Sequence, residues 1–433
     1  MLRTIDLRGR ALSPAELLAT VPRAVAAREQ ALATAAQLVA DVAEHGEAAL
    51  RGQAERFDGV AGHDIRVPAA HLEEALAAID PAVRAALESA IERVRIASAA
   101  QVPPASVTEI APGAVVRQRW QPVRRVGLYV PGGKAVYPSS VVMNVVPAQV
   151  AGVTQVALAS PPQREAGGRV HPVILAAARL LGVEEVYAMG GAGAIGAFAH
   201  GVESLGLDPV DVVTGPGNNY VAAAKRAVAG VVGTDAEAGA TEILIVADAA
   251  ADPRLIAVDL ISQAEHDEQA SAVLVTDSPE LAASVLSEIA PRAAATRHAE
   301  RVAVALAGPQ SAIVLVDDLA AATAFSNAYA PEHLELHLAD PRAEDFVHAG
   351  AVFVGPDSPV SLGDYLAGSN HVLPTGGQAR YSAGLSAATF LRPQQVIEYD
   401  RAALAEVRDA IVALAEAEQL PAHGEAVVAR FSA

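Results

Sequence analysis

The stretch TEILIVADAAADPRLIAVDLISQAEHDEQASAVLVTD, residues 241–277, decides the fold class. It begins and ends with runs of aliphatic and β-branched residues, and the segment between them shows helical spacing of apolar residues after Asp252 and Pro253. An N-capping aspartate followed by proline is a typical helix start. A strand, a helix and a second strand in this order form a βαβ unit, which requires a parallel sheet. The stretch therefore predicts an α/β protein.

The same alternation recurs on both sides of this stretch. Further strand-like runs are RVGLYV (125–130), QVALAS (155–160), EEVYAM (184–189), VDVVTG (210–215), SAIVLVDD (311–318) and GAVFVG (350–355). The rhythm breaks near GTDAEAGA (233–240), where glycine and acidic residues replace apolar ones. Helical spacing predicts helices within 14–55, 70–100 and 401–430. We therefore expect two incomplete Rossmann-like domains with mostly parallel sheets, an N-terminal helical segment and a C-terminal helical tail.

Composition narrows the class of protein. The chain has 433 residues, enough for two or more domains, and its 52% apolar but only 4% aromatic residues predict a core of Ala, Val, Leu and Ile. A net charge of −19 without a Lys/Arg cluster argues against nucleic acid as a partner. No apolar run of about 18 residues and no signal-peptide pattern occurs, so we expect a cytoplasmic protein without a membrane partner. The absence of cysteine excludes a thiolate ligand or nucleophile.

Two motifs place polar residues at the ends of predicted elements. Gln263 and His266 lie three apart near the end of the helix after Asp252, a spacing that can aim two ligands at one metal or mark a solvated helix end. In NAYAPEHLELHL (327–338), leucines alternate with polar residues as in a strand, and Glu332 and His333 lie in the turn before it. This adjacent pair is suited to acid/base chemistry, although a polar turn gives the same pattern.

Two later segments add candidate ligands. SPVSLGDYLAGSNHVLPTGG (358–377) contains Asp364 and His371 in a stretch too long for a simple connector. Glu418 and His423 flank Pro421, and a proline turn is needed to bring them together because five residues span about 140° of a helix. The nitrogen and oxygen donors that could meet at one metal are Gln263, His266, Asp364 and His423. This sulfur-free set suits zinc, with some tolerance for manganese or cobalt.

Glycine-rich turns suggest a dinucleotide site. GGAGAIG (190–196) contains G-x-G-x-x-G directly after a strand, and Asp211 lies 20 residues beyond Gly191. The alternative is a helix start that packs closely on the sheet. A second turn, TGPGNNY (214–220), also joins a strand to a helix, so its amides could face a phosphate.

A series of motifs resembles one family in that family's order. They are VGLYVPGG (126–133), VTGPGNNYVAAAKR (213–226), DAEAGATEI (235–243), ISQAEHD (261–267), NAYAPEHLE (327–335), GDYLAGSNHVLPT (363–375) and YSAGLS (381–386). These are similar to the successive signatures of histidinol dehydrogenases. The resemblance implies a homodimer with shared active sites. It also implies four segments: an N-terminal helical segment (1–26), a first Rossmann-like domain (27–128 plus 239–385), a second Rossmann-like domain on the NAD side (129–238), and a tail that reaches the partner subunit (386–433).

The resemblance also implies roles for individual residues. One zinc ion per subunit would be bound by Gln263, His266 and Asp364 of one protomer and His423 of the other. Glu332 and His333 match the acid/base pair. Tyr129, Gly193 and Asn218 fall where NAD is contacted, and Gly193 replaces the glutamine of the usual GGAQA. The positions expected to contact or support the substrate are Thr241, Gln263, His266, His333, Asp364, His371, Glu418 and His423. Ala240 replaces the usual proline before Thr241.

The implied activity is a four-electron, NAD-dependent oxidation of L-histidinol through L-histidinal to L-histidine, the last step of histidine biosynthesis. His333 would take the alcohol proton and Glu332 would activate water for the second oxidation. Two alternatives remain open. One is a related zinc- and NAD-dependent dehydrogenase for another polar alcohol, such as a sulfonated diol. The other is a zinc hydrolase with Glu332 as base, which would leave both α/β halves without a role.

Overall fold

The computed structural model describes residues 2–23, 26–132, 135–236 and 239–432. Parts of the predicted helix at 14–55 and of the motifs VGLYVPGG, GTDAEAGA and DAEAGATEI fall on residues 24–25, 133 and 237–238, outside the described residues. The chain divides into two compact units. The first comprises Met1–Gln101 and Val123–Phe390, and the second comprises Val102–Pro122 and Leu391–Ala433. Each is described by itself.

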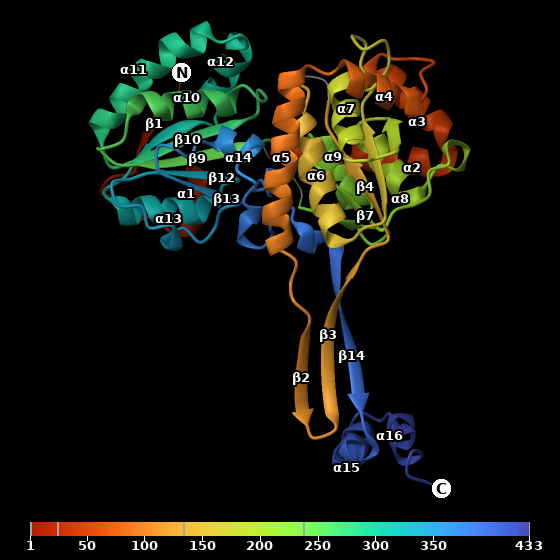
Figure 1. The fold of residues 1–433 in the computed structure, drawn as a ribbon. Helices are drawn as coiled ribbons and strands as arrows, with labels where there is room; N and C mark the ends of the chain where they lie inside the picture. The colour runs from red at the N-terminus through yellow and green to blue at the C-terminus, as the bar shows by residue number, and fades with distance from the viewer. Residues whose placement is uncertain (1, 24–25, 133–134, 237–238, 433) are drawn as a thin grey trace. The chain divides into compact units, whose positions relative to one another are not determined.

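A six-stranded parallel sheet forms half of the first unit. Its strands, in spatial order, are β1 (Arg3–Asp6), β11 (Ala312–Leu315), β10 (Ser271–Thr276), β9 (Glu242–Ala247), β12 (His333–His337) and β13 (Ala351–Val354). Helices cover both faces (Figure 1). One face packs against α10 (Pro253–Ala264), α11 (Pro279–Ala295), α12 (Ala299–Ala307) and α14 (Val360–Tyr365). The other packs against α1 (Pro14–Thr20) and α13 (Leu319–Tyr329).

A five-stranded parallel sheet forms the other half. Its strands, in spatial order, are β6 (Glu185–Ala188), β5 (Gln155–Ser160), β4 (Arg125–Tyr129), β7 (Val212–Thr214) and β8 (Gly233–Thr234). One apolar cluster joins this sheet to α2 (Ala26–His45), α3 (Glu47–Gln53), α8 (Gly191–His200) and α9 (Asn219–Ala227). A second set of helices packs together on this half of the unit: α4 (Ala69–Ala78), α5 (Pro81–Ala100), α6 (Pro138–Ala151) and α7 (Pro172–Leu180).

The two sheets share one strand order. Counted from β9 in one sheet and from β4 in the other, the spatial order is third, second, first, fourth, fifth, and β1 extends the six-stranded sheet beyond β11. This is the order of Rossmann-like sheets, in which the chain reverses its direction of travel beside the first strand. The predicted fold class, two incomplete Rossmann-like domains with mostly parallel sheets and a C-terminal helical end, is confirmed.

Local sequence explains the elements that carry the candidate residues. Strand β9 has the sequence EILIVA, and all six residues are buried. All but the glutamate are aliphatic, as expected for a central parallel strand covered on both faces. The predicted start of α10 is confirmed, because Asp252 is its N-cap, accepts from Arg254 N–H and precedes Pro253 at the first helical position. Asn218 and Asp318 cap α9 and α13 in the same way.

The second unit is a ribbon with a helical end. Strands β14 (Leu391–Tyr399), β3 (Ala114–Pro122) and β2 (Ser106–Ala111) pair antiparallel, and α15 (Arg401–Ala417) and α16 (Pro421–Val428) follow. Few of its side chains are buried. Several apolar ones are more than half exposed, namely Val107, Ile110, Ile397 and Leu414.

Three features differ from the sequence-based expectations. The N-terminal segment, expected to be helical, begins with strand β1, which pairs with β11 at the edge of the sheet. The hairpin of β2 and β3 was not expected at all. Helix α10 ends at Ala264, so His266 lies in the turn beyond it and not on the helix. In the described residues, no helix is long and apolar enough to cross a membrane.

Candidate active site

The predicted acid/base pair lies at the amino end of β12, and the predicted substrate contact Thr241 lies at the amino end of the neighbouring strand β9. Thr241 directly precedes β9, Glu332 directly precedes β12, and His333 is the first residue of β12, where it pairs in register with Ile243. Because α10 runs antiparallel to these strands, its last turn, which contains Gln263, reaches the same end of the sheet. Local topology therefore brings together residues that lie up to 92 positions apart in the sequence.

A continuous chain of short hydrogen bonds connects three of these residues. Gln263 Nε2 donates to Thr241 Oγ1 at 2.6 Å, and Thr241 Oγ1 donates to Glu332 Oε2 at 2.6 Å. The backbone N–H of Glu242 donates to the same carboxylate oxygen at 2.8 Å. Since the amide nitrogen of Gln263 is used in this chain, its Oε1 is the atom left for a metal or substrate.

Glu332 is poised to exchange a proton near neutral pH. Its side chain is buried, and burial raises the pKa of Glu332 to about 7, although His333, the Thr241 hydroxyl and the Glu242 N–H all favour the charged form. A carboxyl group with such a pKa can accept a proton and return it without a large energetic cost in either direction.

Hydrogen bonding fixes the tautomer of His333. Its Nδ1 lies 3.1 Å from the backbone carbonyl oxygen of Glu242, which can only accept. Nδ1 therefore carries the hydrogen, and Nε2 is the basic atom of the neutral ring. Nδ1 also lies 3.5 Å from Glu332 Oε2, so the carboxylate would stabilise the ring once it is protonated.

Three further predicted residues lie near this pair. Burial lowers the pKa of His266, which keeps its imidazole neutral, and both Asp364 and His333 are near enough to act on it electrostatically. Asp364 lies on α14. His371 Nδ1 donates to the backbone oxygen of Asp364 at 3.0 Å and lies 3.8 Å from its Oδ1. His371 therefore acts on the segment that carries Asp364.

Sequence reasoning missed the residues that hold His371. The hydroxyl of Ser140, on α6, donates to His371 Nε2 at 3.0 Å. Asn144, one turn later, donates to the backbone oxygen of Ser140 at 2.8 Å and accepts from Thr214 Oγ1 at 2.7 Å. Ser140, Asn144 and Thr214, which form this series of hydrogen bonds, are all buried. The only local signal is Ser139, Ser140 and Asn144 in an otherwise apolar helix start, YPSSVVMN, which does not identify a partner 231 residues away.

The donors that the first unit brings together fit a borderline metal ion. The amide oxygen of Gln263, the neutral imidazole of His266 and the carboxylate of Asp364 supply oxygen and nitrogen without sulfur. The fourth predicted ligand, His423, lies in the first turn of α16 in the second unit. Glu418 lies there as well, as the C-cap of α15. Both are exposed.

A separate group of three side chains could also hold a metal by geometry. Ligand atoms of Asp259, Glu335 and His337 lie within 4.8 Å of one another. None of them belongs to the predicted ligand set. The alternation in HLELH suggests that Glu335 and His337 face solvent, but both are buried because α10 covers that face of β12. The carboxylate–imidazole contact is loose, with His337 Nε2 3.4 Å from Glu335 Oε2.

The residues expected to contact NAD lie on the five-stranded sheet. Tyr129 ends β4, and its hydroxyl accepts from Gly191 N–H at 3.1 Å; burial raises the pKa of Tyr129 to about 12. Asn218 follows β7, and its Oδ1 accepts from the N–H groups of Tyr220 and Val221. The suggestion that the amides of this turn face a phosphate therefore fits poorly, since these two are already bonded.

The glycine pattern at 191–196 favours close packing over a dinucleotide fingerprint. A Cβ on Gly193 would lie 2.4 Å from Gln53 Oε1, and one on Gly196 would lie 3.2 Å from Val39 Cα, so α8 packs tightly on α3 and α2. Asp211 accepts from the N–H groups of Arg124 and Arg125. It therefore lies at the amino ends of the strands, opposite to Tyr129.

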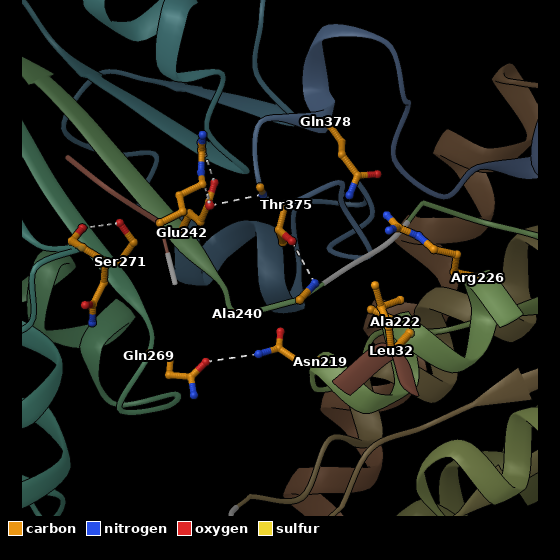
Figure 2. Close-up of a pocket in the computed structure, with 15 residues that line it drawn as sticks. Leu32, Asn219, Ala222, Arg226, Ala240, Glu242, Gln269, Ser271, Thr375 and Gln378 are labelled. Carbon is orange, nitrogen blue, oxygen red and sulfur yellow. Dashed lines mark hydrogen bonds and ion pairs between the residues drawn. The ribbon is translucent and has the colours of Figure 1, made fainter. Parts of the chain in front are cut away.

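A cavity of about 120 Å³ lies near the amino end of β9, where Ala240 and Glu242 line it (Figure 2). Glu242 is on its wall, and side-chain alternation along β9 directs Glu242 away from Thr241. Arg23 binds the Glu242 carboxylate at 2.6 and 3.1 Å, and Asn219 donates to Gln269 at 3.2 Å. None of the predicted catalytic or metal-binding residues lines this cavity.

Comparisons with known proteins agree along the whole chain. The family model described as histidinol dehydrogenase matches residues 21–431. The histidinol dehydrogenase of Leifsonia xyli subsp. xyli is 66% identical over 432 residues, covering 99% of both chains. That of Thermobifida fusca is 58% identical over 429 residues, covering 99% of this chain and 97% of the relative.

A solved structure is similar in fold over the same length. The crystal structure of histidinol dehydrogenase from Elizabethkingia anophelis matches with a TM-score of 0.91 and 31% sequence identity, and the match covers 99% of this chain and 98% of that one. Sequence relatives, the family model and this structure give the same result. The chain belongs to the histidinol dehydrogenase family.

Proposed function

We propose that this protein oxidises L-histidinol through L-histidinal to L-histidine in two NAD-dependent steps, the last step of histidine biosynthesis. The observation that carries the proposal is the hydrogen-bonded chain from Gln263 through Thr241 to Glu332, beside His333 with its free Nε2. An acid/base pair next to candidate metal ligands is what an alcohol oxidation followed by a hydration requires.

His333 acts as the base in the first oxidation. Its Nδ1 hydrogen is held by the Glu242 carbonyl, so Nε2 takes the proton of the substrate hydroxyl. NAD, when bound, accepts the hydride. Glu332 lies 3.5 Å from the ring and favours the protonated imidazole that results.

Glu332 acts in the second oxidation. Its pKa of about 7 suits removal of a proton from water as water adds to the aldehyde. The Thr241 hydroxyl and Glu242 N–H orient the carboxylate for this task. The chain contains no cysteine, so the covalent thiohemiacetal of thiol-dependent aldehyde dehydrogenases is not available to it.

The donor set of Gln263, His266 and Asp364 suits one zinc ion per subunit. Zinc, when bound, would hold the amino and imidazole nitrogens of the substrate. The His371 ring and the Ser140 hydroxyl that orients it keep the segment of Asp364 in place. Zinc is thus proposed because these nitrogen and oxygen donors suit it. Zinc and NAD are the two cofactors of the proposed reaction.

Completion of the site by a second copy is part of the proposal. His423 and Glu418 lie in the second unit, whose exposed Val107, Ile110, Ile397 and Leu414 leave apolar surface that a monomer would hold in water. We propose a symmetric homodimer in which segment 386–433 of one protomer supplies these residues to the other. The division into 1–26, 27–128 plus 239–385, and 129–238 is proposed with it.

The alternatives are less well supported. Identity of 66% over 99% of a histidinol dehydrogenase favours histidinol over another polar alcohol. A zinc hydrolase would need no NAD, and it would leave the second Rossmann-like sheet without a role. No observation on the site favours either one.

The test is the stoichiometry of the reaction. Zinc-loaded protein is mixed with L-histidinol and excess NAD, NADH is followed at 340 nm, and histidine is quantified. Two NADH per histidine, lost on chelation, is the expected result. Absence of NADH formation by protein that still binds zinc would reject histidinol as the substrate.

A further inference from the structure

The buried strand β12, which lies between β9 and the edge strand β13, carries polar side chains where a buried parallel strand normally carries apolar ones. His333, Glu335 and His337 project to the face that α10 covers, because side chains alternate along a strand. Leu334 and Leu336 pack into the core on the opposite face. Glu335 is only 1% exposed and His337 only 6%, so both have lost contact with water. His333 belongs to the candidate site, and the two residues behind it need another explanation.

Glu335 caps a helix to which it does not belong. Its Oε1 accepts from the N–H of Val360, the first residue of α14, at 2.8 Å. The N-cap position of α14 is Pro359, and the helix has no side-chain cap of its own. A buried N–H group without an acceptor would destabilise the folded protein. A carboxylate on the neighbouring strand therefore satisfies the start of this short helix.

The remaining contacts hold this carboxylate in place. Its Oε2 faces His337 Nε2 at 3.4 Å, and Asp259 on α10 completes the group. Burial, together with the charge of Glu335, raises the pKa of Asp259 to about 7. Asp259 is therefore readily protonated where it faces Glu335, which limits repulsion between the two side chains.

The position of α14 determines the position of Asp364, four residues after Val360. The residue before it, Gly363, packs so closely on β13 that a Cβ there would lie 2.6 Å from the ring of Phe353. The helix is thus fixed at its start by Glu335 and near its end by Phe353. Asp259, in turn, lies one helical turn before Gln263 on α10.

On the basis of the proposed function, in which Asp364 is a metal ligand, we propose that Glu335 is a positioning residue. It caps α14 from the adjacent strand and so fixes the Asp364 carboxylate relative to the ligands at the end of α10. Three elements that carry candidate ligands or the base thereby share one buried anchor.

Full-length protein with three substitutions tests this assignment. Glu335→Ala removes the acceptor of Val360 N–H. Glu335→Gln keeps an oxygen at the same place and should rescue. His337→Ala is the matched control, because it disturbs the same buried group and leaves the Val360 bond intact. Zinc affinity is measured by competition with a chelator, and hydrogen–deuterium exchange is followed over 360–365.

Glu335→Ala should weaken zinc binding about tenfold or more, the usual effect of removing a residue that orients a ligand. It should also speed exchange over 360–365, while Glu335→Gln and His337→Ala remain close to wild type in both measurements. Wild-type zinc affinity in Glu335→Ala, or an equal loss in His337→Ala, would overturn the assignment. Wild-type protein that binds no zinc would instead contradict the proposed function, and unchanged exchange in Glu335→Ala would then reject the capping role by itself.

Discussion

The six-stranded and five-stranded sheets have the same strand order, yet their candidate residues lie at opposite ends of the strands. On the five-stranded sheet, Tyr129 ends β4 and Asn218 follows β7, at the carboxyl ends where open α/β sheets usually bind ligands. On the six-stranded sheet, Thr241 precedes β9 and His333 opens β12, at the amino ends.

Helix direction gives this difference a physical meaning. The helices that follow parallel strands begin at the carboxyl ends and finish at the amino ends of the sheet. Helix C-termini carry partial negative charge, so the amino ends favour cations and proton-accepting chemistry. Helix N-termini carry partial positive charge and favour anions, as in dinucleotides. One fold used at its two ends thus suits the proposed metal and base site on one sheet and the proposed cofactor site on the other.

The largest effect is expected for His333, the proposed proton acceptor on the six-stranded sheet. His333→Ala should lower kcat about 10²- to 10⁴-fold, because the substrate hydroxyl loses its proton acceptor. Zinc binding should remain. His337→Ala, on the same face of the same strand, should retain most activity, and steady-state kinetics on both variants make the comparison. Equal losses in the two variants would mean that the whole polar face, and not its amino end, carries the chemistry.

A close contact on the six-stranded sheet gives the next effect. Gly363→Ala would bring a Cβ within 2.6 Å of the Phe353 ring, which is held in the core, so α14 or the ring must shift. We expect a loss of about 1–3 kcal/mol in the free energy of unfolding, measured with urea, and weaker zinc binding. Phe353→Leu in the same background should restore part of both. An unperturbed Gly363→Ala variant would show that α14 has room to move.

Asp259, the partly buried acid on α10, predicts a pH effect on stability. The pKa of Asp259 is raised from its ordinary value of 3.8 to about 7, so the folded protein binds more protons than the unfolded chain between these limits. Stability contributed by this group is therefore present at low pH and lost as pH rises toward 7, with a slope of at most ~1.4 kcal/mol per pH unit. Asp259→Asn should flatten this part of the profile, measured by urea unfolding from pH 4.5 to 7.5. An unchanged slope would contradict the raised pKa.

The smallest effect is expected on the five-stranded sheet. A Cβ at Gly193 meets the end of the Gln53 side chain, which can move more easily than a ring. Gly193→Ala should therefore cost about 1 kcal/mol or less, and Gln53→Ala should relieve it. The KM for NAD should change little in the double variant if position 193 serves packing. A large rise in KM would instead mean that this glycine lies against the cofactor.

Sequence patterns predicted the sheets because each core strand is a short aliphatic run that needs no distant partner to be recognised. RVGLYV and TEILIVAD are examples, and both became central strands. The strand Arg3–Asp6 was missed because RTID is a mixed edge strand stabilised only by pairing with β11. The hairpin of β2 and β3 was missed because its strands, SVTEIA and AVVRQRWQP, are exposed or only partly buried apart from Ala114 and lack the aliphatic run of a core strand.

For the candidate site, the sequence identified residue types better than contacts. The bond from Thr241 to Glu332 joins residues 91 positions apart, and no local pattern encodes it. Alternation in HLELH was informative about the strand but misleading about exposure, because it does not reveal that α10 covers the polar face. Glu335 as a remote cap and Ser140 as the partner of His371 became evident only in three dimensions.

Anomalous diffraction at the zinc edge, from crystals of zinc-loaded protein, tests the central claim most directly. The account predicts a peak at the amino ends of β9 and β12, bounded by Gln263, His266 and Asp364. A peak among Asp259, Glu335 and His337, with none at the amino ends, would contradict this prediction. It would place the metal between β12 and α10.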